Sequence, residues 1–283
     1  MIEKKLHGNK SLSLNDILEV YTWLQMEESV NQMKAIKSNF TKLDNLTGGF
    51  FPGEVTVVGS RPTIGKTAFI ASIIKNIIRE PGNNCLFFSI EMSAETFCNR
   101  LAASMLRIPF SKIRDSLLNE KEEAIFQKQL KEIRDLPLYI EDDPDQNIAD
   151  LCTLARKIVR EKDIKIIFID YLGLIHTSND SSPVYDQIAF SMKKLKILAR
   201  QLNIPIVITC QVARSGYSST PPDLSQLRGS GDVESIADVV LLIDRETSKE
   251  ICATKLIVAK NHNGALGTAE IVFLPDLVLF EED

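Results

Sequence analysis

The sequence of 283 residues is 44% hydrophobic and 25% charged, which is typical of a soluble globular protein and excludes a disordered chain, a collagen and a coiled coil. It has no apolar run near the about 18 residues of a membrane span, and its charged N-terminus lacks the apolar stretch of a secretory signal, so we expect neither membrane attachment nor export. With 33 Lys and Arg against 38 Asp and Glu, the net charge of −5 excludes a broad basic surface, and any contact with nucleic acid is expected to be local.

Residues 1–37 are predicted to form a helix and a linker. Ser13, with Asp16 three residues later, is a typical helix start, and apolar side chains recur at helical spacing beyond it, as far as about Met33. This apolar stripe packs either on the chain's own domain or on a neighbouring copy, and the pattern alone does not choose between the two. The polar segment 31–39 is predicted to be a linker.

Residues 38–283 are predicted to form an α/β domain with a mostly parallel central sheet flanked by helices, because short apolar runs alternate there with amphipathic stretches. Runs such as IKIIFID and PIVITC are rich in β-branched residues, as expected for strands covered on both faces. The final segment, with its Asn-Gly and Leu-Gly turns, predicts an antiparallel extension at the sheet edge. The predicted strands are 54–58, 85–90, 138–140, 164–169, 204–209, 239–243, 256–259 and 271–274, and the predicted helices are 66–79, 94–106, 120–136, 147–162 and 184–202.

The segment SRPTIGKT follows the first predicted strand and precedes a helix, which is the context of a phosphate-binding loop. In such a loop the backbone N–H groups face the phosphates, Lys66 reaches the β and γ phosphates, and the Thr67 hydroxyl ligates Mg²⁺. The common pattern has glycine where this chain has Ser60, so the loop is slightly irregular. The alternative is a chance GKT at a strand-to-helix turn. The predicted nucleotide-binding residues are Ser60, Arg61, Pro62, Thr63, Ile64, Gly65, Lys66 and Thr67.

Polar side chains end three further apolar strands. Asp170 ends IKIIFID and is the predicted second support for Mg²⁺. Because Tyr171 rather than an acid follows it, the predicted catalytic base is Glu91, at the end of CLFFSIE; the alternative for this residue is a structural acid at a helix N-terminus. Gln211 ends another buried run, where its amide is expected to contact the γ-phosphate or the attacking water.

The motifs SRPTIGKT, FSIEMS, IIFIDYLGLI, IVITCQVAR, DLSQLRGSGDVESIADVV and IVAKNHNGALGT occur in the order and approximate spacing of the motor domain of DnaB-type replicative DNA helicases. The sequence resembles this family from about residue 38 to the end. The resemblance implies a RecA-like P-loop NTPase fold, a homohexameric ring, ATP and Mg²⁺ as cofactors, and ATP-driven movement along single-stranded DNA. It gives Lys66, Thr67, Glu91, Asp170 and Gln211 the same roles as the residue patterns do.

The resemblance also places single-stranded DNA contacts in the loop LRGSGD. An arginine pairs with a DNA phosphate, and glycines let main-chain N–H groups approach the backbone. Six such loops converging on the axis of a ring would let an acidic chain bind DNA. The alternative is a flexible surface loop without a ligand. The predicted DNA-binding residues are Arg228, Gly229, Ser230 and Gly231.

The similar helicases complete each ATP site with a Lys and an Arg from the adjacent subunit, in an AKxRNG-like segment. Here the segment is AKNHNG, so Lys260 is kept and His262 stands at the arginine position. A histidine is only partly cationic near neutral pH and lacks the guanidinium fork, so we expect weaker stabilisation of charge on the phosphates. The family usually has a separate N-terminal domain that meets primase, and this chain, with no room for one, is either a motor-only relative or a fragment.

Two classes of function follow from these patterns. The first is an ATP hydrolase coupled to DNA unwinding, with a helicase loader or primase as a partner. The second is a nucleotide-gated oligomeric DNA-binding or scaffold protein with weak ATPase activity, which the histidine favours; a RecA-like recombinase is a third candidate. The five cysteines lie far apart without a CxxC pair, so we expect reduced core thiols in a cytoplasmic protein.

Overall fold

The structure is a computed structural model that describes residues 35–177, 183–212, 221–227, 229–245 and 252–282, together with Leu14. The chain divides into two compact units, residues 1–34 and 35–283, and the second contains the sheet. The predicted N-terminal helix therefore lies outside the described residues, apart from Leu14.

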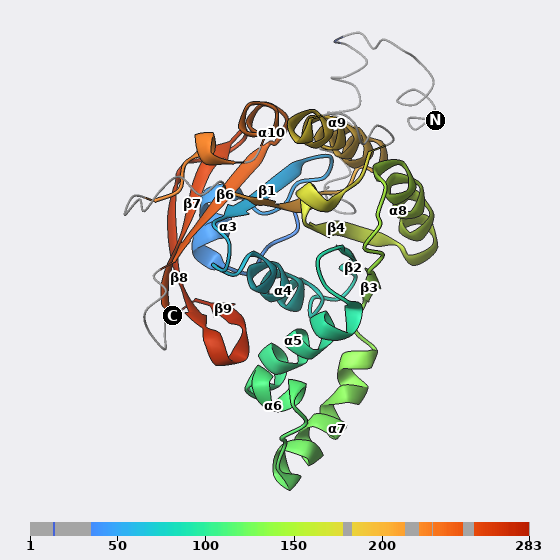
Figure 1. Ribbon diagram of the computed structural model, residues 1–283, viewed down its shortest axis with the longest axis vertical. Coiled ribbons are helices and arrows are strands. Elements are labelled where there is room, and N and C mark those ends of the chain that lie inside the picture. The colour runs from blue at the N-terminus through green and yellow to red at the C-terminus, as the bar shows by residue number, and fades with distance from the viewer. Residues whose placement is uncertain are drawn as a thin grey trace. The chain divides into compact units, whose positions relative to one another are not determined.

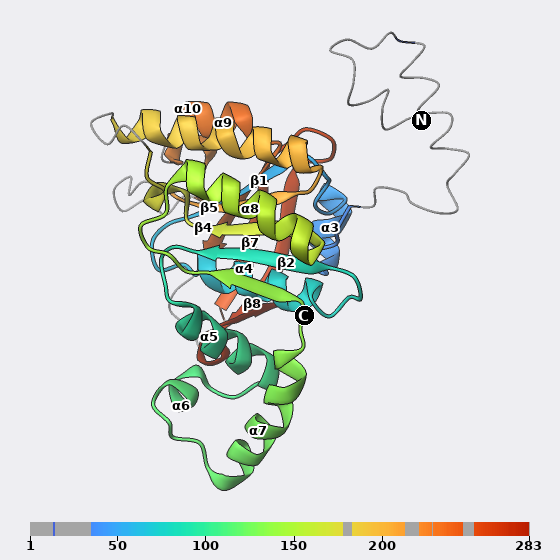
Figure 2. The same ribbon diagram turned by 90° about the vertical axis from the view of Figure 1, so that its right-hand side faces the viewer.

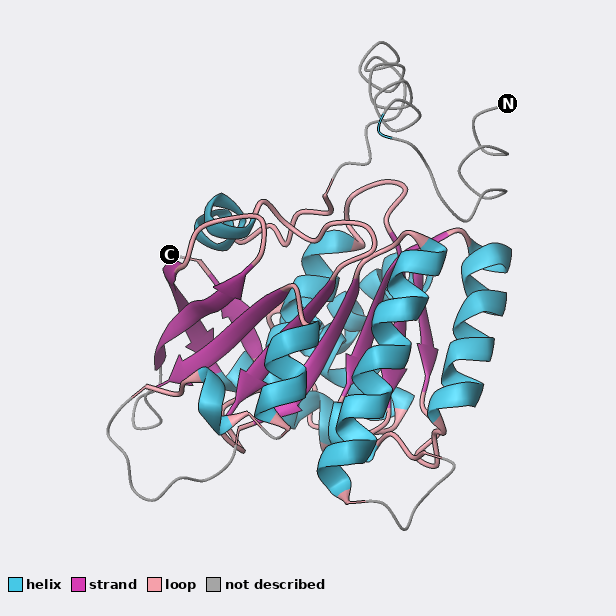
Figure 3. Cartoon of the chain, turned by 90° about the horizontal axis from the view of Figure 1, so that it is seen from above, coloured by secondary structure: helices cyan, strands magenta, loops and turns pink. Residues whose placement is uncertain are grey.

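Within the described ranges, nine strands form one sheet in the order β3-β2-β4-β5-β1-β6-β7-β8-β9 (Figure 3). The strands from β3 to β6 in this order are parallel to their neighbours, and β7, β8 and β9 continue the sheet as antiparallel strands. This confirms the predicted parallel sheet with its antiparallel C-terminal extension. The strands are β1 (Val55–Ser60), β2 (Asn84–Ser89), β3 (Leu138–Glu141), β4 (Ile164–Asp170), β5 (Ile206–Gln211), β6 (Val239–Arg245), β7 (Cys252–Asn261), β8 (Gly267–Leu274) and β9 (Leu279–Glu281).

Helices cover both faces of the parallel part (Figure 2). Right-handed crossovers explain the distribution: the chain steps toward β3 after β1 and β2, and in the opposite direction after β3, β4 and β5. The helices of the first two steps pack in one core, with Phe69 and Phe97, and those of the last three in the other, with Met192 and Val233. The helices are α3 (Thr41–Thr47), α4 (Lys66–Ile77), α5 (Ala94–Leu106), α6 (Phe110–Arg114), α7 (Glu120–Arg134), α8 (Ile148–Lys162), α9 (Val184–Leu202) and α10 (Ser230–Ile236).

The predicted and observed elements differ mainly in short segments and at strand ends. The sequence pattern does not predict α3, α6, α10 or β9, because elements of three to seven residues are too short to show a hydrophobic period. Strands β1 and β5 end two residues later than predicted, because their ladder continues to the polar pair Ser60 and Gln211. Helices α5, α6 and α7 extend away from the sheet (Figure 1).

The cysteines in the described ranges carry thiols rather than disulfides. Cys85, Cys152, Cys210 and Cys252 are buried, which confirms the prediction of core thiols, whereas Cys98 on α5 is exposed. Among the described residues, no helix has the length and apolar character to cross a bilayer.

Candidate nucleotide site

The predicted phosphate loop joins the end of β1 to the start of α4. Gly65 occupies the N-cap of α4 with φ of +111°, a conformation that side chains rarely adopt. A Cβ at this position would lie 3.3 Å from the ring of Phe280. The loop therefore presents the N-terminal N–H groups of a twelve-residue helix, which is the geometry expected for binding phosphate.

Two contacts that the sequence does not predict hold this loop in place. From β6, Arg245 donates through Nη2 to the carbonyl oxygen of Thr63 at 3.0 Å, while its guanidinium stacks 4.2 Å from the ring centroid of Phe273. From β9, Phe280 packs edge-on against Phe69 of α4, with ring centroids 5.7 Å apart. The loop is therefore fixed by the antiparallel C-terminal strands as well as by the strand that it follows.

Asp170, at the end of β4, is buried and lies beside the start of α4. Thr67 donates its hydroxyl to Asp170 Oδ2 at 2.5 Å, and Thr209 of β5 donates its hydroxyl to Oδ1. The hydroxyl and carboxylate oxygens of Thr67 and Asp170 are the type of ligand that Mg²⁺ takes beside phosphate oxygens. No group of three or more His, Cys, Asp and Glu suited to a metal occurs in the described ranges. These two residues thus fit a metal that is bound together with a nucleotide.

Glu91 follows β2, next to β4 in the sheet. Its backbone N–H donates to the carbonyl oxygen of Asp170 at 3.2 Å, and that of Ile90 donates to the same oxygen at 2.9 Å. Partial desolvation and the negative Asp170 raise the pKa of the Glu91 carboxyl, and the cations Lys66 and Arg100 partly oppose this. Glu91 is therefore close enough to Asp170 and Lys66 to interact electrostatically with both, as a base acting on a bound phosphate would be.

Arg100 of α5 is a further charged group beside these acids that the sequence does not predict. Burial lowers the pKa of its guanidinium, and the attraction of Asp170 and Glu91 opposes that shift. The guanidinium lies 5.6 Å from the ring centroid of Phe110, and within the described part of the chain its buried Nε has no hydrogen-bond partner. It is a cation held close to the candidate base.

Gln211 lies opposite Ser60 in the ladder between β5 and β1, and the next residue, Val212, donates its backbone N–H to Ser60 O at 2.9 Å. The amide is therefore beside the first residue of the phosphate loop. The loop, Glu91, Asp170 and Gln211 all follow the carboxyl ends of parallel strands, where the crossovers change direction. Ligands of open α/β sheets bind at such a position.

Lys260 and His262 lie at the opposite edge of the sheet. Lys260 pairs with Val240 near the start of β6, and His262 donates its backbone N–H to Asp238 O at 3.0 Å. The length of β1 separates this edge from the phosphate loop, roughly 17 Å at about 3.3 Å per residue. One chain does not bring these two residues to its own Lys66.

The predicted DNA-binding residues are only partly described. Arg228 and the side chain of Ser230 lie outside the described part of the chain. Gly229 precedes α10 with φ of +73°, and a Cβ there would lie 2.8 Å from Ile188 on α9. Gly231, in the first turn of α10, has open space around it.

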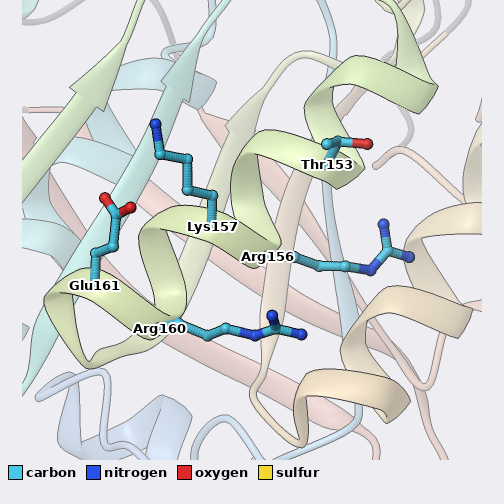
Figure 4. A pocket seen from close by; sticks show the side chains of 5 residues that line it. All are labelled: Thr153, Arg156, Lys157, Arg160 and Glu161. Carbon is cyan, nitrogen blue, oxygen red and sulfur yellow. The ribbon is translucent and has the colours of Figure 1, made fainter.

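A cavity of about 460 Å³ lies elsewhere, on the outer surface of α8 (Figure 4). It is lined by Thr153, Arg156, Lys157, Arg160 and Glu161. Since α8 covers the opposite face of the sheet from α4, this basic surface is separate from the candidate nucleotide site.

The fold and the loop together define a P-loop ATPase domain of RecA-like architecture. Residues 35–282 match the family described as "DnaB-like helicase C terminal domain", and the chain belongs to this family. Among curated relatives, "Replicative DNA helicase DnaB" of Treponema pallidum (strain Nichols) is 40% identical over 250 residues, which cover 88% of this chain and 56% of that protein. The protein of the same name from Geobacillus stearothermophilus is 28% identical, over 97% of this chain and 63% of that protein.

Solved structures support the same assignment. A structure of an isolated ATPase domain matches with a TM-score of 0.86 and 25% identity, over 97% of this chain and all of that one. A structure entitled "The Structure Of A DnaB-Like Replicative Helicase And Its Interactions With Primase" matches with a TM-score of 0.83 over 97% of this chain and 68% of that one. The chain thus spans only part of the length of its curated relatives.

Proposed function

We propose that this chain is the motor of an ATP-dependent replicative DNA helicase, which moves along single-stranded DNA and unwinds duplex as a homohexameric ring. The observation that carries the proposal is the convergence of the phosphate loop, Glu91, Asp170 and Gln211 at one sheet edge in a chain of the DnaB-like family. Each of these residues comes from a different strand end, so only the folded sheet brings them together.

The loop of residues 60–67 would hold the phosphates of ATP. Its backbone N–H groups and the ammonium of Lys66 neutralise phosphate charge. Thr67 and Asp170 would hold Mg²⁺, which when bound would neutralise further charge on the phosphates. Bringing Mg²⁺ in beside Asp170 requires the Thr67 hydroxyl to turn from donating to this carboxylate to ligating the ion.

Glu91 would orient and deprotonate the water that attacks the γ-phosphorus in line with the leaving oxygen. The raised pKa of Glu91 makes its carboxylate a stronger base than an ordinary glutamate while leaving it ionised near neutral pH. Gln211 would contact a γ-phosphate oxygen or that water, and its position beside Ser60 gives it access to the start of the loop.

Lys260 and His262 would act on the nucleotide of a neighbouring copy, because they lie at the edge opposite their own phosphate loop. Residues 228–231 would contact single-stranded DNA in the centre of the ring. Residues 1–37 would be a linker that docks on the adjacent subunit, residues 38–283 would be the motor domain, and a helicase loader or primase would be a partner. The buried thiols are consistent with a cytoplasmic protein.

The substitution Glu91→Gln tests the proposal. It should retain ATP binding, because the phosphate loop is unchanged, and should lower DNA-stimulated ATP hydrolysis by about a hundred-fold or more through loss of the base. The assay is steady-state phosphate release with and without single-stranded DNA, beside binding of a fluorescent ATP analogue. Glu95→Gln, in the exposed first turn of α5, is the matched control and should keep its full rate. Unchanged turnover of the Glu91 variant would count against the assignment.

The second candidate, a nucleotide-gated scaffold with weak ATPase activity, rests on His262. The same measurement separates the two functions. Stimulation of the wild-type rate by single-stranded DNA fits a motor, and a low rate that DNA does not change fits a scaffold.

A further inference from the structure

Asp238 is a buried carboxylate that joins four elements at the sheet edge carrying Lys260 and His262. Its Oδ2 accepts from the backbone N–H of Val55, at the start of β1, at 2.7 Å. Lys196 of α9 donates to both carboxylate oxygens, at 2.7 and 2.8 Å, and also to Gly53 O at 3.0 Å. The Asp238 side chain is 11% exposed, so the pair is screened little by solvent.

The C-terminal end of β7 rests on this pair and on α10. His262 donates its backbone N–H to Asp238 O, and its Nδ1 lies 3.4 Å from Asp238 Oδ1. Lys260 donates to the carbonyl oxygens of Glu234 and Ala237, at 2.5 and 2.7 Å, at the C-terminal end of α10. A cation is favourable at this end of a helix.

A β-bulge aims Lys260 at these carbonyls. In the ladder between β6 and β7, Val240 pairs with Lys260 while Leu241 pairs with Val258, so Ala259 is an extra residue. Val258 packs in the core on the α4 side. Without the extra residue, Lys260 would follow the alternation of the strand and share the face of Val258, whereas the bulge turns it to the α10 side.

This arrangement also connects Lys260 to the candidate DNA loop. Helix α10 is seven residues long and begins directly after Gly229. Its N-terminal turn therefore belongs to the segment proposed to contact DNA, while its C-terminal carbonyls hold the lysine proposed to act on a neighbour's nucleotide.

We propose that Asp238 and Lys196 are positioning residues, which fix the end of β7 and its contact with α10 so that Lys260 and His262 are presented to the nucleotide site of the neighbouring copy. This inference rests on the proposed function. Lys260 leaves the carbonyls of α10 when it engages a phosphate, and the Asp238 anchor keeps the backbone in place during that exchange. Neither residue touches the nucleotide.

The first test is Asp238→Asn in the full chain. The amide keeps the size of the carboxylate and an oxygen for the Val55 N–H, but loses the charge that faces Lys196 and His262. Since a shift of about 1 Å at a reacting group costs up to about a hundred-fold in rate, kcat with saturating single-stranded DNA should fall about ten- to a hundred-fold. Affinity for a fluorescent ATP analogue should stay unchanged, because the phosphate loop is at the other edge.

Two further variants separate positioning from general damage. Lys196→Met keeps the apolar stem and should reproduce the loss, whereas Lys196→Arg should restore part of the rate. Asp232→Asn is the matched control, because Asp232 and Lys193 also pair between α10 and α9, but at 3.7 Å and in solvent. It should keep the wild-type kcat.

Mixed rings give a readout that a merely structural role would not move. A Lys66→Ala chain has a defective phosphate loop but normal Lys260 and His262, and an Asp238→Asn chain has the reverse. Mixing the two should raise hydrolysis above the sum of the separate pools, because some sites then combine two intact halves. Normal kcat in both pair variants, or mixed rings without this gain, would overturn the positioning role. A wild-type chain that DNA does not stimulate would instead overturn the proposed function itself.

Discussion

Thr209 is the residue whose hydroxyl completes the hydrogen bonding of Asp170, from a strand that carries no charge at that point. Thr209→Val removes the donor at nearly constant volume and leaves one oxygen of a buried carboxylate unpaired. We expect a loss of about 1–3 kcal/mol in the free energy of unfolding. We also expect about a ten-fold higher Mg²⁺ concentration for half-maximal ATP hydrolysis, as is usual when a partner of a metal ligand is removed.

Titrating Mg²⁺ in the ATPase assay checks the Thr209 prediction. Thr209→Ser keeps the hydroxyl and should behave as the wild type. A valine variant with unaltered Mg²⁺ dependence would show that Thr67 alone is enough to orient Asp170.

Arg100 is expected to set the pH at which Glu91 becomes ionised. Its positive charge lowers the pKa of Glu91, while desolvation and Asp170 raise it. Because hydrolysis needs the ionised base, kcat should fall as the pH drops through the pKa of Glu91. Arg100→Met removes the lowering charge and should move this acid limb to higher pH, whereas Arg100→Lys should move it less. A kcat profile of the Met variant that overlays the wild type would place Arg100 outside the electrostatics of the base.

The C-terminal strand β9 is the element that supports the phosphate-loop helix from outside the parallel sheet. Phe280 is 1% exposed and contacts the rings of Phe69 and Phe273, and its backbone N–H donates to Ser72 of α4 at 2.9 Å. Phe280→Ala should lower the free energy of unfolding by about 3–5 kcal/mol through the cavity that it leaves. It should also weaken nucleotide binding, because the ring lies against Gly65.

Urea unfolding with and without ATP analogue measures both effects of Phe280→Ala. Leu266→Ala is the control, since Leu266 is 64% exposed between β7 and β8 and should change stability by less than about 0.5 kcal/mol. Equal losses from the two substitutions would mean that β9 does not support the loop.

The sequence predicts the strand ends well and the contacts between elements poorly. Glu91, Asp170 and Gln211 are each a polar residue at the end of a buried run, and parallel strands bring such ends to one edge. Arg100 and Thr209 carry no such signal, since one lies within a helix and the other within a buried strand, and only the packing of α5 and β5 brings them to the acids. Strand β9 escapes prediction for a related reason, because three residues show no periodicity and its partner β8 fixes its position.

At the scale of the whole molecule, the two halves of the proposed catalytic centre lie at opposite edges of one sheet. The phosphate loop follows the carboxyl end of β1, whereas Lys260 lies near the start of the neighbouring β6. A closed ring is the arrangement in which every such edge meets the complementary edge of the next copy, without leaving any half unused. Assembly is thus expected to be a condition for hydrolysis as well as for DNA binding by a chain of net charge −5.

We therefore expect a particle of six 31.7 kDa chains in the presence of nonhydrolysable ATP analogue and single-stranded oligonucleotide. Light scattering after size-exclusion chromatography measures this mass, and the specific ATPase rate should rise with protein concentration over the same range in which the ring forms. Lys260→Ala should keep the mass and lose most of the rate, since the residue acts across the interface. Full hydrolysis by a monomer would contradict the shared site, because the distance between the two edges leaves Lys260 no route to its own nucleotide.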